Sequence, residues 1–222
     1  MAIKHIIFDF DDTLIYSTRY YLKNMVEAAE MLGLRKPTEK EILQPADSWE
    51  DAIKTLWKEA DVEKFKEKYT EIASRIEYPC VEGAVLALEK LKDKYSLYIL
   101  SKRGGDLASL RIEQSGIKQE FFKKMFFYED TEYRKPDPRT FNELFQEIER
   151  QEKSSLKLEE ILSVGDNTDD MKASLGIGIN FVAVLTGYYT EDDFINLGLE
   201  RKNIIKSVAC LPDYLLNNKG YD

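Results

Sequence analysis

Short apolar runs recur along the chain, and charged segments with helical spacing separate them. Apolar runs without polar alternation are typical of strands that are buried on both faces of a parallel sheet. Between two of them, Val85, Leu88 and Leu91 share one face of a predicted helix, and residues 138–152 repeat that spacing. This alternation predicts an α/β fold with a parallel sheet. The predicted strands are residues 6–10, 96–100, 124–128, 161–164 and 180–185.

A stretch after the first strand interrupts the alternation with helical patterns alone. Thr38 followed by Glu41 has the spacing of a capping box, and Ser48 with Asp51 predicts another helix start. Two apolar stripes follow, and we interpret their aromatic side chains as the core of a small helical bundle. The sequence therefore predicts an all-α domain inserted into the α/β core. The predicted division is residues 1–15 and 79–222 for the core and residues 16–78 for the insert.

The charge balance narrows the classes of partner. The chain has 32 basic and 41 acidic residues, a net charge of −9, which argues against general affinity for nucleic acid or an anionic membrane. No apolar run approaches the roughly 18 residues of a membrane span, and no signal-peptide pattern precedes the first strand, so we expect a cytoplasmic protein. Its oligomeric state, monomer or homodimer, is left open. Cys80 and Cys210 form no metal-binding pair, and the single histidine, His5, excludes a multi-histidine metal site.

Two of the predicted strands run directly into acidic segments. Asp9 and Asp11 follow the first strand in the segment DFDDT, and Asp166 and Asp170 follow a later strand in the segment GDNTDD. Taken alone, either segment is also compatible with a solvated turn or a helix N-cap. The carboxyl ends of parallel strands share one edge of a sheet, so we expect these carboxylates to gather there. Two unit charges 4 Å apart repel by about 4 kcal/mol at an effective dielectric near 20, so the cluster requires a cation, and oxygen ligands favour Mg²⁺.

Further residues suit a phosphate site at the same edge. Ser101 ends the strand of residues 96–100 and can donate its hydroxyl, and the backbone N–H groups of Lys102 and Arg103 can donate beside it. Lys135 precedes a predicted helix and can balance the charges of Asp9 and a phosphate oxygen. A single serine or lysine is most often an ordinary surface residue. The order of these residues after successive strands is what favours a phosphate site.

With these motifs in this order, the sequence resembles the haloacid dehalogenase-like hydrolases over essentially its whole length. The form that it resembles carries a helical, C1-type cap after the first strand, as in phosphoglycolate phosphatases and β-phosphoglucomutases. The first and last motifs are specific in combination, and the middle two add support by their order. The sequence departs from the family pattern at Lys102, where the family often has asparagine after the serine or threonine of the second motif. This difference leaves open which contacts the segment makes with the substrate. The motifs are Asp9-x-Asp11-x-Thr13, Ser101, Lys135-Pro136 and Gly165-Asp166-x-x-x-Asp170.

The resemblance implies a Rossmann-like, doubly wound sheet with an inserted all-α cap, and a Mg²⁺-dependent reaction through an aspartyl phosphate. It implies that Asp9 is the nucleophile, that Asp11 is the general acid and base, and that Lys135 stabilises charge. Asp170 would support the metal, with Asp169 as a competitor for that role. The implied metal ligands are Asp9, Asp11 through its backbone carbonyl, Asp166 and Asp170. The implied phosphate contacts are Thr13, Ser101, Lys102 and Lys135.

We therefore expect a phosphomonoester hydrolase that acts on a small phosphorylated metabolite, with the cap selecting the leaving group. A phosphomutase that keeps Asp9 phosphorylated is the alternative, because the core motifs do not separate the two reactions. A phosphonatase would need a Schiff-base lysine in the cap, and Lys54 and Lys58 have no identifying context. Dehalogenase activity is disfavoured, because Asp11 and a cluster of magnesium ligands have no role in that reaction. A binding module without catalysis is disfavoured because every expected catalytic residue type is present.

Overall fold

The computed structural model describes residues 2–44, 46 and 48–217, and the chain divides into two compact units. One unit joins the start of the chain, up to Tyr16, to the part that begins at Pro79, and the other unit is Ser17–Tyr78. Among the described residues, no helix combines the length and the apolar character needed to cross a membrane.

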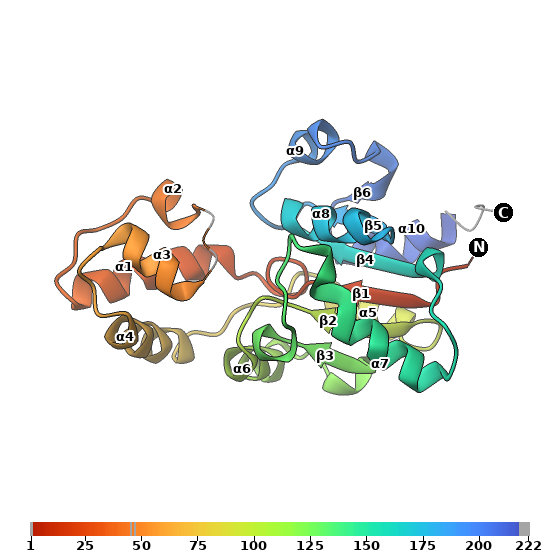
Figure 1. Ribbon diagram of the computed structural model, residues 1–222, viewed down its shortest axis with the longest axis horizontal. Helices are drawn as coiled ribbons and strands as arrows, with labels where there is room; N and C mark the ends of the chain where they lie inside the picture. The colour runs from red at the N-terminus through yellow and green to blue at the C-terminus, as the bar shows by residue number, and fades with distance from the viewer. Residues whose placement is uncertain (1, 45, 47, 218–222) are drawn as a thin grey trace. The chain divides into compact units, whose positions relative to one another are not determined.

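A six-stranded parallel sheet in the order β3-β2-β1-β4-β5-β6 forms the centre of the first unit (Figure 1). The apolar runs explain why these segments are strands: Ile6, Ile7 and Phe8 of β1 are almost completely buried. Burial of consecutive residues means that both faces of the sheet are covered, as in doubly wound α/β folds. The strands are β1 (His5–Phe8), β2 (Ser96–Leu100), β3 (Lys124–Phe126), β4 (Ile161–Gly165), β5 (Asn180–Val184) and β6 (Ile204–Ile205).

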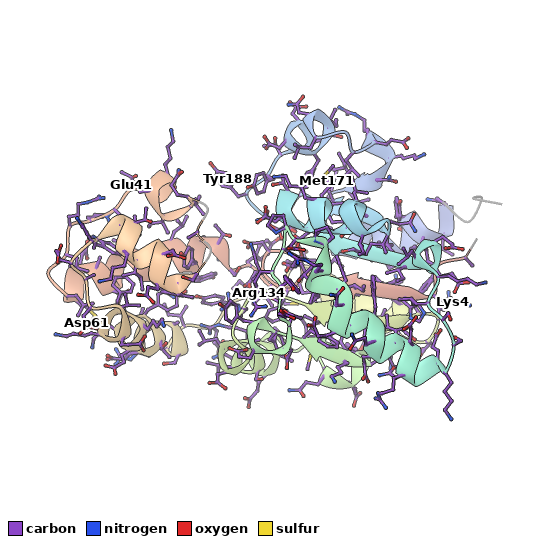
Figure 2. The ribbon with its side chains drawn as sticks, in the orientation of Figure 1. Lys4, Glu41, Asp61, Arg134, Met171 and Tyr188 are labelled. Carbon is purple, nitrogen blue, oxygen red and sulfur yellow. The ribbon has the colours of Figure 1, made fainter. Side chains whose placement is uncertain are left out.

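Helices flank the sheet on both faces. On one face, Ile7 and Tyr98 pack with Leu144 and Ile148 of α7. Beside them, Met171 of α8, labelled in Figure 2, packs with Phe181 and Phe194. Successive strand residues point to opposite faces, and Ile6 and Leu97 on the other face are equally buried. The helices of this unit are α5 (Ala84–Leu91), α6 (Gly105–Ser115), α7 (Asn142–Glu152), α8 (Thr168–Ile177), α9 (Glu191–Asn196) and α10 (Leu211–Asn217).

The register of the sheet brings the chemical motifs to one edge. Phe8 is paired with Ile99 on one side and with Val164 on the other. The residue after each strand therefore leaves the sheet at nearly the same level, and Asp9, Ser101 and Asp166 lie together at the carboxyl ends. Lys4, before β1, and Arg134 mark the two opposite ends of the sheet in Figure 2.

Three predicted strands end earlier than expected, and one predicted helix is divided. The strands expected at residues 6–10, 124–128 and 180–185 end at Phe8, Phe126 and Val184. Phe10 is buried although it lies outside β1. Its apolar side chain therefore extends the apolar sequence run beyond the last residue that pairs in the sheet. The helix expected at residues 138–152 begins with a 3-10 turn, Pro138–Phe141, before α7 starts.

The insert is joined to the core by two backbone segments that pair with each other. Ile15 and Cys80 form an antiparallel bridge. Tyr16 N–H donates to the Pro79 carbonyl at 2.8 Å, and Val81 N–H donates to the Leu14 carbonyl at 2.9 Å. The two ends of the insert thus leave the core side by side.

The insert itself contains four helices within its described residues, grouped together in Figure 1. The capping box of Thr38 and Glu41 is confirmed, and Ser48 caps the next helix by accepting the Asp51 N–H at 3.1 Å. The predicted apolar stripes face inward at most positions, but Trp49 is 37% exposed and lies edge-on against Tyr69. The helices are α1 (Thr18–Met31), α2 (Glu39–Ile42), α3 (Trp49–Leu56) and α4 (Val62–Ser74).

Candidate active site

The segment after β1 turns sharply and presents its acidic side chains at the carboxyl end of the sheet. Asp9 still follows the strand, because its N–H donates to the Val164 carbonyl at 2.8 Å. The chain then reverses: the Leu14 and Ile15 N–H groups both donate to the Phe10 carbonyl, and Asp12 adopts a left-handed conformation with φ 51°. Aspartate tolerates that conformation better than most residues, which suits the acidic composition of the turn.

Three carboxylates from distant parts of the sequence meet at this edge. Asp9, Asp166 and Asp170 each offer one oxygen, and these oxygens lie within 4.8 Å of one another. Asp166 follows β4 directly, whereas Asp170 lies in the first turn of α8. The side chain of Asp170 reaches back to accept the Asn167 N–H at 3.1 Å, and this capping contact turns it toward the strand end.

Lys135 lies inside this cluster and is almost completely buried. Its Nζ donates to Asp9 Oδ1 at 2.7 Å and to the Leu100 carbonyl at 2.8 Å, and it lies 2.5 Å from Asp170 Oδ1. An ammonium has three N–H groups, so all three have acceptors. Burial acts to lower the pKa of Lys135, but the Asp170 and Asp9 carboxylates outweigh it and raise that pKa above its ordinary value. The lysine therefore stays charged.

One lysine does not neutralise the cluster. Burial, with smaller contributions from Asp170 and Asp11, raises the pKa of Asp9 to about 7 despite the opposing pull of Lys135. Burial also raises the pKa of Asp166 well above its ordinary value, and the charges of Asp9 and Asp170 add to that rise. Both shifts mean that further positive charge would be bound favourably here. The hard oxygen donors of Asp9, Asp166 and Asp170 fit a Mg²⁺ ion, which prefers carboxylates at short range.

The side chain of Thr13, predicted to contact phosphate, lies against the carboxylate cluster. Its side chain is fully buried, and its hydroxyl donates to Asp166 Oδ1 at 3.1 Å. This hydrogen bond fixes the orientation of a carboxylate that could ligate the metal. Such outer contacts commonly set ligand geometry in metal sites.

The segment after β2 carries the remaining predicted residues. Ser101 is buried, and its Oγ accepts the Arg103 N–H at 3.1 Å, so the hydroxyl proton is left to donate to another group. The exposed side chain of Lys102 pairs with Asp169 Oδ2 at 3.1 Å. Of the two aspartates that competed for the metal-supporting role, Asp170 lies in the carboxylate cluster and Asp169 lies in this surface pair.

A residue whose side chain the sequence did not single out lies next to Asp11. The Arg103 guanidinium donates from Nε to both carboxylate oxygens of Asp11, at 3.0 Å each, and from Nη2 to Oδ1. Arg103 is 12% exposed and Asp11 is 31% exposed. The two residues are 92 positions apart, so no local spacing pattern indicates the pair.

Two glycines leave room for the carboxylates. A Cβ atom on Gly165 would lie 2.6 Å from Cγ of Asp170, and a Cβ atom on Gly187 would lie 2.7 Å from Cγ of Asp166. Carbon atoms do not approach so closely, so a side chain at either position would displace the carboxylate. Gly187 lies in the segment after β5, where the Thr186 hydroxyl donates to the Asp12 carbonyl. Tyr188, labelled in Figure 2, follows it and is exposed.

Comparison with known proteins gives a family match across most of the chain. The model of the family described as "haloacid dehalogenase-like hydrolase" matches residues 6–184. This range includes all four motifs, from Asp9-x-Asp11-x-Thr13 to Gly165-Asp166-x-x-x-Asp170, and it spans the whole of the insert.

Individual relatives are more distant. A Caldanaerobacter subterraneus subsp. tengcongensis protein, provisionally named pyrophosphatase PpaX, is 27% identical over 204 residues, which cover 83% of this chain and 82% of that protein. A provisionally assigned haloacid dehalogenase-like hydrolase from Bacteroides fragilis has a TM-score of 0.76 at 23% identity, covering 94% and 99% of the two chains. The provisionally named HAD-hydrolase YfnB of Bacillus subtilis, solved with bound magnesium, has a TM-score of 0.67 at 20% identity, covering 90% and 100%. These structural likenesses establish the fold.

The repulsion within the cluster predicts that Asp166→Asn stabilises the metal-free protein. A carboxyl whose folded pKa is raised binds protons more tightly when folded, so the contribution of that carboxyl to stability is greatest at low pH. For Asp9 that stability is lost as pH rises from the ordinary value of 3.8 toward about 7. In EDTA at about pH 8, Asp166→Asn should therefore melt above the wild type, and the difference should shrink toward about pH 5. A gain of about 1 kcal/mol would appear as a rise of roughly 2–4 °C in Tm.

Asp169→Asn is the matched control, because Asp169 pairs with Lys102 at the surface and does not belong to the cluster. This control should show no gain at about pH 8. A melting temperature of Asp166→Asn at or below that of the wild type at that pH would contradict the repulsion.

Gly187→Ala should weaken Mg²⁺ binding, because the added methyl group displaces Asp166. Losing an outer contact of a metal site typically costs about 10–100-fold in affinity, so displacing a ligand should cost at least that much in a calorimetric Mg²⁺ titration. Gly176→Ala creates a comparable clash with Pro138, 2.6 Å from its Cγ, away from Asp166. That control should lower stability and leave the Mg²⁺ affinity unchanged. Wild-type affinity in Gly187→Ala would disprove the steric argument.

Proposed function

Because the chain belongs to the haloacid dehalogenase-like hydrolases, we propose that it is a Mg²⁺-dependent phosphomonoester hydrolase that acts through an aspartyl phosphate on Asp9. The observation that carries the proposal is the buried contact of Lys135 with Asp9 and Asp170, beside Asp166. A relative provisionally named as a pyrophosphatase supports phosphate chemistry, and the magnesium-bound structure of YfnB supports the choice of metal. The substrate would be a small phosphorylated metabolite.

Asp9 is the proposed nucleophile. Lys135 holds one of its oxygens, Oδ1, at 2.7 Å, which fixes the carboxylate and leaves Oδ2 to attack phosphorus. A carboxylate nucleophile divides hydrolysis into two displacements, first forming the acyl phosphate and then hydrolysing it. Because phosphoryl transfer depends mainly on positioning and charge neutralisation, a rigidly held nucleophile is an advantage in both steps.

Asp9, Asp166 and Asp170 would hold the Mg²⁺ ion, with the Asp11 backbone carbonyl as a further ligand. When bound, the ion supplies positive charge that reduces the repulsion between the Asp9 carboxylate and the phosphate dianion. Thr13 would act on this ligand set through its hydrogen bond to Asp166, which holds one carboxylate oxygen in place.

Ser101 would donate to the phosphoryl group from the side of β2, and Lys135, whose three N–H groups already have acceptors, would attract that group through its charge. The Ser101 hydroxyl proton is available to a phosphate oxygen because its own oxygen already accepts the Arg103 N–H. The Lys102 backbone N–H is the neighbouring proposed donor, while its side chain remains with Asp169. Lys135 is the only cation in direct contact with Asp9 among the described ion pairs, so it would stabilise the charge that develops during transfer.

Asp11 is the proposed general acid and base. It would protonate the leaving alkoxide in the first displacement and take a proton from the attacking water in the second. The helical insert, Ser17–Tyr78, would act as the cap that selects the leaving group and excludes water.

Asp9→Asn should abolish phosphate release while leaving the fold intact, because it removes the nucleophilic charge without changing the size of the side chain. Wild-type protein with Mg²⁺ should release stoichiometric inorganic phosphate from a panel of phosphorylated metabolites, and EDTA should stop the reaction until Mg²⁺ is restored. Stoichiometric release also separates a hydrolase from a phosphomutase. Turnover by Asp9→Asn at the wild-type rate, with deamidation excluded by mass spectrometry, would refute the assignment of the nucleophile.

Asp11→Asn should discriminate between leaving groups. An alkoxide needs a proton as the P–O bond breaks and a nitrophenolate hardly does, so formation of the phosphoenzyme should slow much more for alkyl than for aryl phosphates. Acid–base assistance is typically worth about 10²–10⁴-fold. The second step needs a base for either substrate, so phosphorylated Asp9 should persist after an aryl phosphate in a rapid-quench experiment. Equal slowing of both first steps without phosphoenzyme would assign Asp11 to the metal site alone.

A further inference from the structure

Arg103 touches two groups of the proposed site through different atoms. Its guanidinium donates hydrogen bonds to the Asp11 carboxylate, and its backbone N–H donates to Ser101 Oγ at 3.1 Å. Ser101 and Asp11 come from different strand ends, after β2 and β1. One residue therefore links the proposed phosphate hydroxyl to the proposed proton-transfer carboxylate.

The backbone of Arg103 is itself fixed in place. Its carbonyl accepts the Tyr128 N–H at 2.9 Å, and the nearby Gly105 N–H donates to Glu129 Oε2 at 2.9 Å. The segment after β2 is thus braced against the segment after β3. A side chain that extends from such a segment can hold its partner at a defined position, which a side chain on a mobile loop cannot do.

We infer that Arg103 is a positioning residue that holds the Asp11 carboxylate in place for proton transfer. The inference rests on the proposed function, because it assigns Arg103 a role only through Asp11. Asp11 is 31% exposed and lies in a turn, so without a partner its side chain would rotate among several orientations. Two donors of a planar fork restrict both the position and the plane of the carboxylate, whereas a lysine would offer only a point charge.

One alternative is that the pair only stabilises the fold. Exposed ion pairs typically contribute about 0–1 kcal/mol, whereas removing one partner of a buried pair costs more, and Arg103, 12% exposed, and Asp11, 31% exposed, lie between these cases. The other is that Arg103 contacts the substrate directly, although its Nε and Nη2 both donate to Asp11. These two readings, a purely structural pair and a direct substrate contact, are the alternatives that an experiment must separate.

The test compares Arg103→Gln and Arg103→Lys with Arg150→Gln. Arg150 forms a similar two-donor pair with Glu147 on the surface of α7, at 2.9 and 2.7 Å, and controls for loss of such a pair. For glycerol 2-phosphate, Arg103→Gln should lower kcat by about 10–100-fold, within the range that acid–base assistance supplies, with KM nearly unchanged. Formation of the phosphoenzyme from nitrophenyl phosphate should slow less, Arg103→Lys should recover part of the loss in kcat, and Arg150→Gln should match the wild type.

Combining the substitutions isolates the coupling. In an Asp11→Asn background, adding Arg103→Gln should cost less than about 2-fold further, because residues that act as a unit are not additive. A multiplicative loss in that background, or a rise in KM for both substrates, would mean that Arg103 contacts the substrate and would overturn the inference. Wild-type kcat in Arg103→Gln would overturn it as well.

A measurement without turnover keeps this result separate from the proposed function. The ¹⁵N-labelled Nε–H signal of Arg103, assigned by its absence in Arg103→Lys, should shift and exchange faster with water in Asp11→Asn. An unchanged signal would mean that the pair does not form in solution, which also overturns the inference. If the wild type releases no phosphate from any substrate while this signal responds as expected, the proposed function fails and the pair stands.

Discussion

The buried charge of Lys135 is the interaction on which the carboxyl end of the sheet depends. Its ammonium is shared among Asp9, Asp170 and the Leu100 carbonyl, so one side chain holds the segment after β1, the end of β2 and the start of α8 together. Burying a charge is costly unless it is paired, and here the pairing is complete for the lysine but incomplete for the carboxylates. The pKa values of Asp9 and Asp166 are raised because these buried carboxylates lack enough positive charge around them. The same imbalance that strains the metal-free site would give a divalent cation its affinity.

Much of this arrangement could be predicted from sequence because it follows from strand order. Apolar runs located the five longest strands, and parallel strands place their carboxyl ends on one edge. That rule brought Asp9 and Asp166 together across more than half the chain. Edge elements were missed: β6 has two residues, Ile204 and Ile205, both only partly buried, too short for an apolar run to mark it. The overlong first strand has the opposite cause, since burial of Phe10 imitates a strand residue inside a turn.

Side-chain partners were harder to predict because they depend on orientation and not on spacing. Asp169 and Asp170 are adjacent, and only the position of Asn167 as the cap of α8 decides which of them turns toward β4. The hydrogen bond from the Thr13 hydroxyl to Asp166 is likewise not indicated by the spacing of the acidic motif. The contact of Arg103 with Asp11 joins two loops with no local signal in either. Predicting such contacts requires knowing how each loop leaves its strand, which is a property of the folded backbone.

The paired segments at Ile15 and Cys80 have a consequence for how the chain could diversify. The insert leaves and re-enters the core at adjacent points. The core therefore constrains only the two ends of the insert, which must lie side by side. Doubling the length of a flexible loop costs only about 0.6 kcal/mol in closure entropy. Residues between the two segments could therefore be lengthened, shortened or exchanged with little effect on sheet register or on the geometry around Asp9. A scaffold built this way separates the part of the sequence that must stay constant from the part that is free to vary, and selection can act on recognition without disturbing the chemistry.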